Sequence, residues 1–188
     1  MKKNTLATHP GAILSLIFSI TFCLFAGMAF STAALANPSP FGMTMGELSA
    51  HEAVPRYSLQ PQGYSLYSGG PMFTAPVAQF QFEGLQELML IFDAEKRLAG
   101  VVATFRKRDF DRLYSALSSR YTLINSTIPF VGNKSAEFRD GSTEIHLDSP
   151  HMSFEMTMSY LDQELVREFR TKTRKEKERQ KRHEQGLL

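Results

Sequence analysis

The chain has 188 residues, of which 21 are Lys or Arg and 19 are Asp or Glu, and its formal net charge is +2. This length suits one domain with a single hydrophobic core. The only cysteine, Cys23, lies near the start of the chain, so a disulfide framework and a cysteine-ligated metal site are excluded.

Residues 1–36 are typical of an export signal. Lys2 and Lys3 form its basic start, residues 13–30 carry no charge, and an Ala-Leu-Ala tripeptide that ends at Ala36 supplies the small residues a signal peptidase inspects. We predict cleavage after Ala36 and a periplasmic or secreted location in a bacterium. Because the 21 basic residues lose Lys2 and Lys3, the mature chain has 19 basic residues against 19 acidic ones and no cysteine.

Two other interpretations of this segment exist. Its apolar run of 18 residues approaches the roughly 20 that a membrane-spanning helix needs, so an uncleaved anchor is an alternative. Lipid attachment at Cys23 is disfavoured, because the bulky Phe22 stands where lipoprotein signals carry a small residue.

The first predicted elements are short. Thr44 and Glu47 have the spacing of a capping box, which predicts a helix over residues 45–50. Residues 54–70 are rich in Tyr, Ser, Gly, Gln and Pro without a sustained period, which predicts a loop with at most a short strand.

Three strands are predicted next. Residues 77–82 alternate apolar and polar side chains, as a half-buried strand does. Residues 85–92 and 98–105 are dense in apolar residues and are separated by a polar turn. Together the three segments predict an antiparallel meander.

A helix is predicted over residues 107–120, where it would cover one face of the sheet. Its apolar residues recur at intervals of three and four and so share one helical face. They are Phe110, Leu113, Tyr114, Leu117 and Tyr121. Asp109 and Asp111 stand in its first turn, where the helix dipole favours carboxylates.

The rest of the domain is predicted as irregular chain, a hairpin and a last strand. Residues 122–130 show no pattern. Residues 136–139 and 143–147 flank Asp140-Gly141, a strong hairpin signal in which both central residues would take positive φ. Residues 151–161 alternate, which predicts a strand with one apolar face formed by Met152, Phe154, Met156, Met158 and Tyr160.

The end of the chain differs in charge from the domain before it. Residues 37–161 contain 10 basic and 13 acidic residues, whereas residues 162–188 contain 9 basic and 6 acidic ones. Leu165, Val166 and Phe169 are expected to pack against the domain. Residues 170–182 have eight basic and two acidic residues and no apolar one. We predict a globular domain over residues 37–161 and a basic C-terminal helix or tail over residues 162–188.

No catalytic, cofactor-binding or metal-binding residue is predicted. His146, Asp148 and His151 lie close in sequence, but Pro150 interrupts them and their spacing is not helical. The sequence has no Gly-x-Ser-x-Gly elbow and no P-loop. Methionines at residues 152–158 suit cuprous ion, but they share a strand face with aromatic residues, which favours core packing. Whether the chain is an enzyme stays open, because catalytic residues can converge from distant positions.

A resemblance to known proteins rests on the run Phe41-Gly42-Met43-Thr44 and on Glu47 and Leu48 after it. With the meander, helix and hairpin that follow, it resembles small exported bacterial proteins of uncharacterised function. Its opening is also similar to that of the BamE family of outer-membrane assembly lipoproteins and of beta-lactamase-inhibitor-like domains. The chain departs from the lipoprotein pattern, because no lipid-accepting cysteine follows its signal. The resemblance implies a scaffold for protein contacts and transfers no binding residue.

The predicted fold class is α+β, with an antiparallel sheet of five or six strands, one packed amphipathic helix and a charged C-terminal helix. We expect a non-enzymatic exported protein that binds another protein or the cell-envelope surface and needs no cofactor. Two alternatives are a small-ligand carrier that uses the sheet face and the tyrosine-rich loop, and an envelope hydrolase.

The expected partner is an unknown protein or an anionic envelope component. Nucleic acid is not expected, because the basic tail has no aromatic residue after Phe169 to stack on bases. A membrane contact is expected only if the N-terminal segment is retained. The candidate interaction residues are Arg170, Lys172, Arg174, Lys175, Arg179, Lys181 and Arg182 in the tail, and Tyr57, Tyr64 and Tyr67 in the loop.

Overall fold

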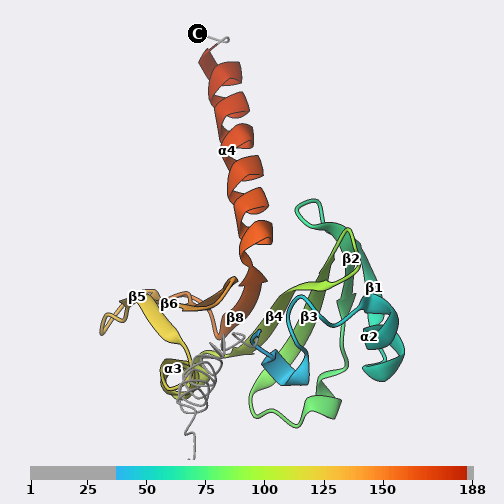
Figure 1. The fold of residues 1–188 in the computed structure, drawn as a ribbon. Helices are drawn as coiled ribbons and strands as arrows, with labels where there is room; N and C mark the ends of the chain where they lie inside the picture. Colours follow the sequence, from blue (N-terminus) through green and yellow to red (C-terminus); the bar gives the residue numbers. More distant parts are fainter. Residues whose placement is uncertain (1–36, 186–188) are drawn as a thin grey trace, which may run out of the picture. The chain divides into compact units, whose positions relative to one another are not determined.

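One antiparallel sheet of eight strands organises the fold (Figure 1). The computed structural model describes residues 37–185, so the predicted signal, its anchor alternative and Cys23 lie outside the described residues. The strands are β1 (Gln60–Tyr64), β2 (Gly69–Thr74), β3 (Leu85–Asp93), β4 (Leu98–Arg106), β5 (Thr122–Thr127), β6 (Lys134–Asp140), β7 (Thr143–Ser149) and β8 (Glu155–Asp162). The α+β class is confirmed, but the sheet has eight strands and the prediction of five or six was too low.

The sheet consists of two four-stranded meanders that meet at their last strands. Its strand order is β1-β2-β3-β4-β8-β7-β6-β5, and β4 pairs with β8 from Gly100 opposite Leu161 to Arg106 opposite Glu155. A helix precedes each meander, α2 (Ala50–Arg56) before β1 and α3 (Phe110–Ser118) before β5. A further helix, α4 (Gln163–Gln185), follows β8 directly and therefore starts from the middle of the sheet.

One face of the sheet carries the hydrophobic core. Alternate side chains of the central strands are fully or almost fully buried there, among them Leu90 on β3, Val101 on β4 and Met158 on β8. Phe110, Leu113 and Leu117 of α3 join the same cluster, as do Ala50 and Ala53 of α2. The predicted amphipathic helix is thus confirmed in its apolar face, although its α-helical part is shorter than residues 107–120, since Lys107–Asp109 form a 3-10 turn, η3.

The predicted helix over residues 45–50 was wrong, because the capping box forms five residues later. The Ser49 hydroxyl accepts a hydrogen bond from the Glu52 backbone N–H, while the Glu52 carboxylate accepts one from the Ser49 backbone N–H, so α2 begins at Ala50. Thr44 instead hydrogen-bonds to the Ser39 hydroxyl at 2.9 Å. Part of the predicted loop over residues 54–70 is helical, and β1 occupies another part of it.

The segment 77–82 is not a strand. Val77–Phe80 form a 3-10 turn, η2, and Gln81 takes a left-handed φ of 44°. The strand that pairs with the outer edge of β3 is β2 and not this segment, and Met72 of β2 lies opposite Ile91 of β3. The Phe80 ring instead stacks on the Tyr57 ring, with 5.8 Å between the ring centroids, so this apolar side chain packs against a residue outside the sheet.

In the second meander the predicted hairpin is confirmed, but the segments before and after it differ from the prediction. Residues 122–130 are not all irregular, because β5 pairs with β6 as an exposed edge strand. The tight loop between β6 and β7 is Gly141-Ser142, and only Gly141 has a positive φ, 54°, which is the type II′ arrangement. Met156, Met158 and Tyr160 of β8 are buried as predicted. Met152 and Phe154 precede the strand and are 90% and 94% exposed.

The C-terminal helix is confirmed. α4 runs for 23 residues, which corresponds to about 35 Å of helix. From Arg174 to Gln185 every residue is exposed. Across residues 37–185, none of the helices combines the length and the apolar character that crossing a membrane requires.

Candidate functional site: the open sheet face and the C-terminal helix

The base of α4 packs on the open face of the sheet, the face opposite the core. Leu165 and Val166 are buried there. Gly100 on β4 makes this approach possible, because a Cβ at that position would lie 3.2 Å from a methyl carbon of Leu165 and 3.3 Å from the Cβ of Ile91. Because Gly100 has no side chain, the base of α4 can pack closely against the central strand β4.

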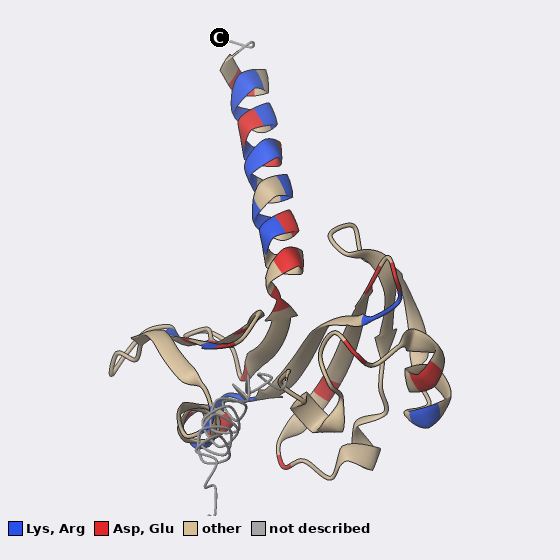
Figure 2. Ribbon diagram, viewed as in Figure 1, with Lys and Arg blue, Asp and Glu red and all other residues tan. Residues whose placement is uncertain are grey.

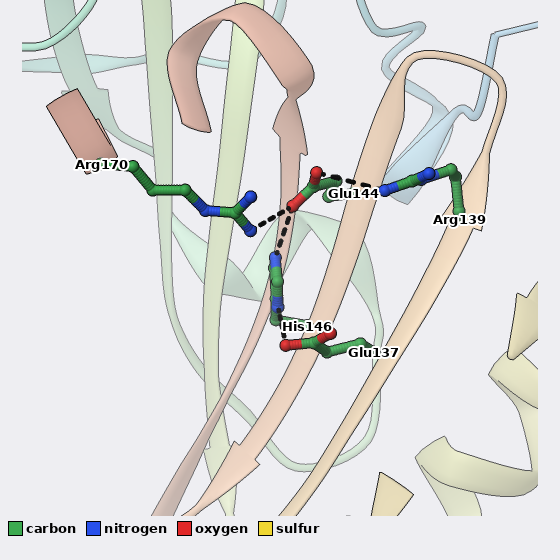
Figure 3. A network of polar contacts seen from close by, with 5 residues as sticks. All are labelled: Glu137, Arg139, Glu144, His146 and Arg170. Atoms are coloured by element: carbon green, nitrogen blue, oxygen red, sulfur yellow. Dashed lines mark hydrogen bonds and ion pairs between the residues drawn. The ribbon is translucent and has the colours of Figure 1, made fainter. Parts of the chain in front are cut away.

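A polar network ties the next turn of α4 to β6 and β7 (Figure 3). The Arg170 guanidinium donates to Glu144 Oε2 at 3.1 Å, and the Arg139 guanidinium donates to Glu144 Oε1 at 3.4 Å. His146 lies between two carboxylates, with Nε2 3.5 Å from Glu144 Oε2 and Nδ1 3.8 Å from Glu137 Oε1. Because the Glu144 side chain is only 9% exposed, these partners compensate for the loss of its hydration.

The hairpin between β1 and β2 holds the other side of α4. The rings of Tyr67 and Phe169 meet edge to face with centroids 4.9 Å apart. The Lys172 ammonium donates to the Leu66 carbonyl and lies 6.0 Å from the centre of the Tyr67 ring. The predicted residues Tyr67, Arg170 and Lys172 are therefore all at the junction between α4 and the sheet.

A cavity of about 380 Å³ lies between α4, the hairpin and the open sheet face. Six aliphatic or aromatic side chains from three strands and the helix line it: Ile91, Val102, Leu161, Leu165, Val166 and Phe169. Ser65, Tyr67, His146 and Arg170 complete the lining. A mostly apolar cavity with a few polar groups at one side is the usual form of a small-molecule site.

Beyond the cavity, the basic residues of α4 form two stripes, and Figure 2 shows Lys and Arg gathered along this helix. Residues three and four apart share a helical face. One stripe is Arg170, Arg174, Lys177 and Lys181, and the other is Lys172, Lys175, Arg179 and Arg182. In the part of the chain that the structure describes, no ion pair involves any of the six basic side chains between Arg174 and Arg182.

The other two predicted tyrosines lie away from this junction. Tyr57 stacks on Phe80 and donates a hydrogen bond to the Gly42 carbonyl at 3.4 Å, so it is part of the packing near α2. Tyr64 is 75% exposed at the end of β1. Sequence reasoning missed the strand residues of the site, Val102 and Glu144 among them, because nothing local in the sequence relates β4 or β7 to α4.

The residues considered for metal binding do not converge. His146 faces Glu144 and Glu137, whereas the His151 backbone N–H donates to Asn133 Oδ1 at 2.7 Å in a loop. Burial raises the pKa of Asp148, and the charge of Glu137 raises it further, while His146 acts in the opposite direction. Within residues 37–185, no group of three or more His, Cys, Asp or Glu side chains is placed to hold a metal ion.

Two loops at the far end of β5 to β8 expose large apolar side chains. Phe130 and Val131 lie between β5 and β6, and Met152 and Phe154 lie between β7 and β8, with exposed fractions from 67% to 103%. The Lys107 ammonium donates to the carbonyls of Pro150 and His151 at 2.7 and 2.6 Å. The second loop is therefore held in place with its apolar side chains in solvent.

Comparisons with known proteins identified no protein similar to this chain. No family model, no curated protein and no solved structure matches the chain. The resemblance of residues 41–48 to BamE-like and beta-lactamase-inhibitor-like openings therefore stays a prediction, and function is argued from the geometry.

Proposed function

We propose that this is a non-enzymatic exported protein that binds an acidic surface of another protein through α4. The observation that carries the proposal is the set of six basic side chains between Arg174 and Arg182, all exposed and none engaged in an ion pair with a described residue. The base of the helix is fixed by Leu165, Val166 and Arg170, so its charged half is presented from a defined position. Complementary charge of this kind speeds association and selects partners.

A protein is favoured over a bilayer or nucleic acid as the partner. Helices that lie in a membrane surface bury an apolar face, but residues 170–185 include no apolar side chain. Binding of single-stranded nucleic acid uses aromatic rings between the basic residues, and this stretch has none. Acidic side chains on a folded partner need only the charges that α4 supplies.

Two charge-reversal variants test the proposal. One combines Arg174→Glu, Lys177→Glu and Lys181→Glu. The other combines Lys175→Glu, Arg179→Glu and Arg182→Glu, so the two change the net charge equally on opposite stripes. Crosslinking from the envelope fraction should capture a partner with the wild-type protein, in a salt-sensitive manner, and lose it with at least one variant.

The same partners captured by both variants, or by a chain that ends at Phe169, would contradict the role of α4. Sedimentation with vesicles of anionic phospholipid provides the second arm of the experiment. Binding to those vesicles as strong as binding to the captured protein would make the bilayer, and not a protein, the acidic surface.

The cavity under α4 favours a second candidate function, a carrier of small ligands. It is lined by residues of the sheet face and of the hairpin that contains Tyr67, the two features the carrier alternative requires. The hydrolase alternative requires a cleft around a perturbed carboxyl or imidazole group. Asp148 has a raised pKa but is not among the residues that line this cavity, so we do not propose hydrolysis.

A further inference from the structure

The cavity beneath α4 is apolar inside and basic at its mouth. Phe169 and Arg170 line the cavity, and both also line a shallow groove that continues along α4 past Arg174, Lys177 and Lys181. Arg170 and Lys177 are two helical turns apart, which is about 10 Å along the axis. The apolar cavity therefore adjoins a groove whose lining includes four basic side chains and one carboxylate, Glu178.

The size of the chamber sets the size of the apolar part of a ligand. A water-sized group takes about 30 Å³ of liquid volume. The cavity of about 380 Å³ thus has room for about a dozen such groups. A medium-length alkyl chain fits this space, and removal of its methylene groups from water favours binding.

The charged side chains at the mouth of the cavity determine which ligand head group can bind there. Arg170 has five N–H donors, and the structure assigns one of its terminal nitrogens to Glu144 while 66% of the side chain stays exposed. The charge of Glu144 is already compensated by Arg139 and Arg170. Donors of Arg170 therefore remain for an anion, and the next cation along the groove, Arg174, is unpaired among the described residues.

We propose that this cavity binds a single-chain amphiphile with an anionic head group, such as a medium-chain carboxylate. The alkyl chain lies against Val102, Leu161 and Val166, and the carboxylate accepts hydrogen bonds from Arg170. This proposal rests on the carrier function and names its ligand class. Its direct head-group contact, Arg170, is not one of the six basic residues assigned to protein binding.

Calorimetric titration with decanoate, below the concentration at which it forms micelles, tests the proposal on the purified protein. One site should be observed. Val102→Phe fills the chamber and should weaken decanoate binding at least tenfold. Arg170→Gln should weaken it about tenfold, the loss expected for one charge-assisted hydrogen bond. Arg108→Gln, with the same change of charge at an exposed position on η3, should leave it within about twofold.

Two further probes separate the ligand class from the carrier function. Decyltrimethylammonium, with an equal chain and a cationic head, should bind at least tenfold more weakly than decanoate, and neutral decanol should lie between them. Equal binding of all three, abolished by Val102→Phe, would overturn the anionic class and leave the carrier function standing. Absence of binding by every probe would overturn both. Ile91→Phe, which fills the same cavity from β3, replaces Val102→Phe if circular dichroism shows that variant unfolded.

Discussion

Phe169→Ala tests whether the base of α4 is held by packing on the hairpin. Phe169 is 48% exposed, so about half of the roughly 200 Å² of a phenylalanine side chain is covered, and at 25 cal/mol per Å² this burial contributes about 2.5 kcal/mol. The alanine methyl group keeps part of that contact, which leaves a loss of about 2 kcal/mol. A loss of this size increases the equilibrium constant for release of α4 about thirtyfold.

Amide hydrogen exchange is the assay. A helix without tertiary contacts is marginally stable in water, so release of α4 lets its amides exchange. We expect exchange at residues 165–172 to speed up about thirtyfold, while amides of β8 keep their rates. Leu66→Ala, at a residue of the same hairpin that is 81% exposed, is the control and should change neither. Unchanged exchange in α4, or an equal rise in α4 and β8, would refute the reasoning.

Three further outcomes are expected. Gly100→Val should displace α4, because its side chain would overlap Leu165, and tryptic cleavage within α4 should become faster while the core stays folded. Met156→Ala should lower the free energy of unfolding by about 2–5 kcal/mol and Met152→Ala by less than about 0.5 kcal/mol in urea titrations, since the first side chain is 1% and the second 90% exposed. Because the folded state raises the pKa of Asp148 above its ordinary value of 3.8, the charged carboxylate opposes folding. Stability should therefore fall as pH rises from below 3.8 through the higher folded-state pKa, and denaturation at several pH values should show a smaller fall for Asp148→Asn. Equal stability losses for the two methionine variants would contradict the position of β8, and an unchanged pH profile would contradict the environment of Asp148.

The elements that sequence reasoning recovered are those whose own apolar spacing decides their structure. α3 places Phe110, Leu113 and Leu117 at intervals of three and four, and all three are buried. β3 and β4 are dense in apolar residues and lie at the centre of the sheet. In such segments burial provides most of the stabilisation, so the pattern alone identifies the element.

The edge strands could not be found in this way. Every residue of β1 and of β5 is exposed, so neither segment carries an alternation, and both are strands only because β2 and β6 offer hydrogen bonds to them. The segment 77–82 shows the reverse case. Its alternation is correct for a strand, but the hydrogen-bonding edge of β3 is already occupied by β2.

The sequence pointed to candidate interaction residues on α4 and in the hairpin between β1 and β2, but to none on the central strands. Arg170, Lys172 and Tyr67 were chosen from charge and composition, which a sequence displays directly. Glu144 lies 26 positions before Arg170, and only the register of β7 against β8 brings them together. Such juxtaposition is a product of the topology, and no local pattern encodes it.

The seam between β4 and β8 also governs how the protein reaches its fold. Every other neighbouring pair in the sheet is made of consecutive strands, whereas this seam joins positions 100 and 161. Closing a longer loop costs more entropy, and contacts between distant positions slow folding. Each meander can therefore assemble by itself before the seam closes, and during that interval β4 and β8 are unpaired edges. In concentrated solution the unpaired β4 of one molecule can pair with the unpaired β8 of another, which gives a domain-swapped dimer. Refolding at low protein concentration therefore favours the monomer.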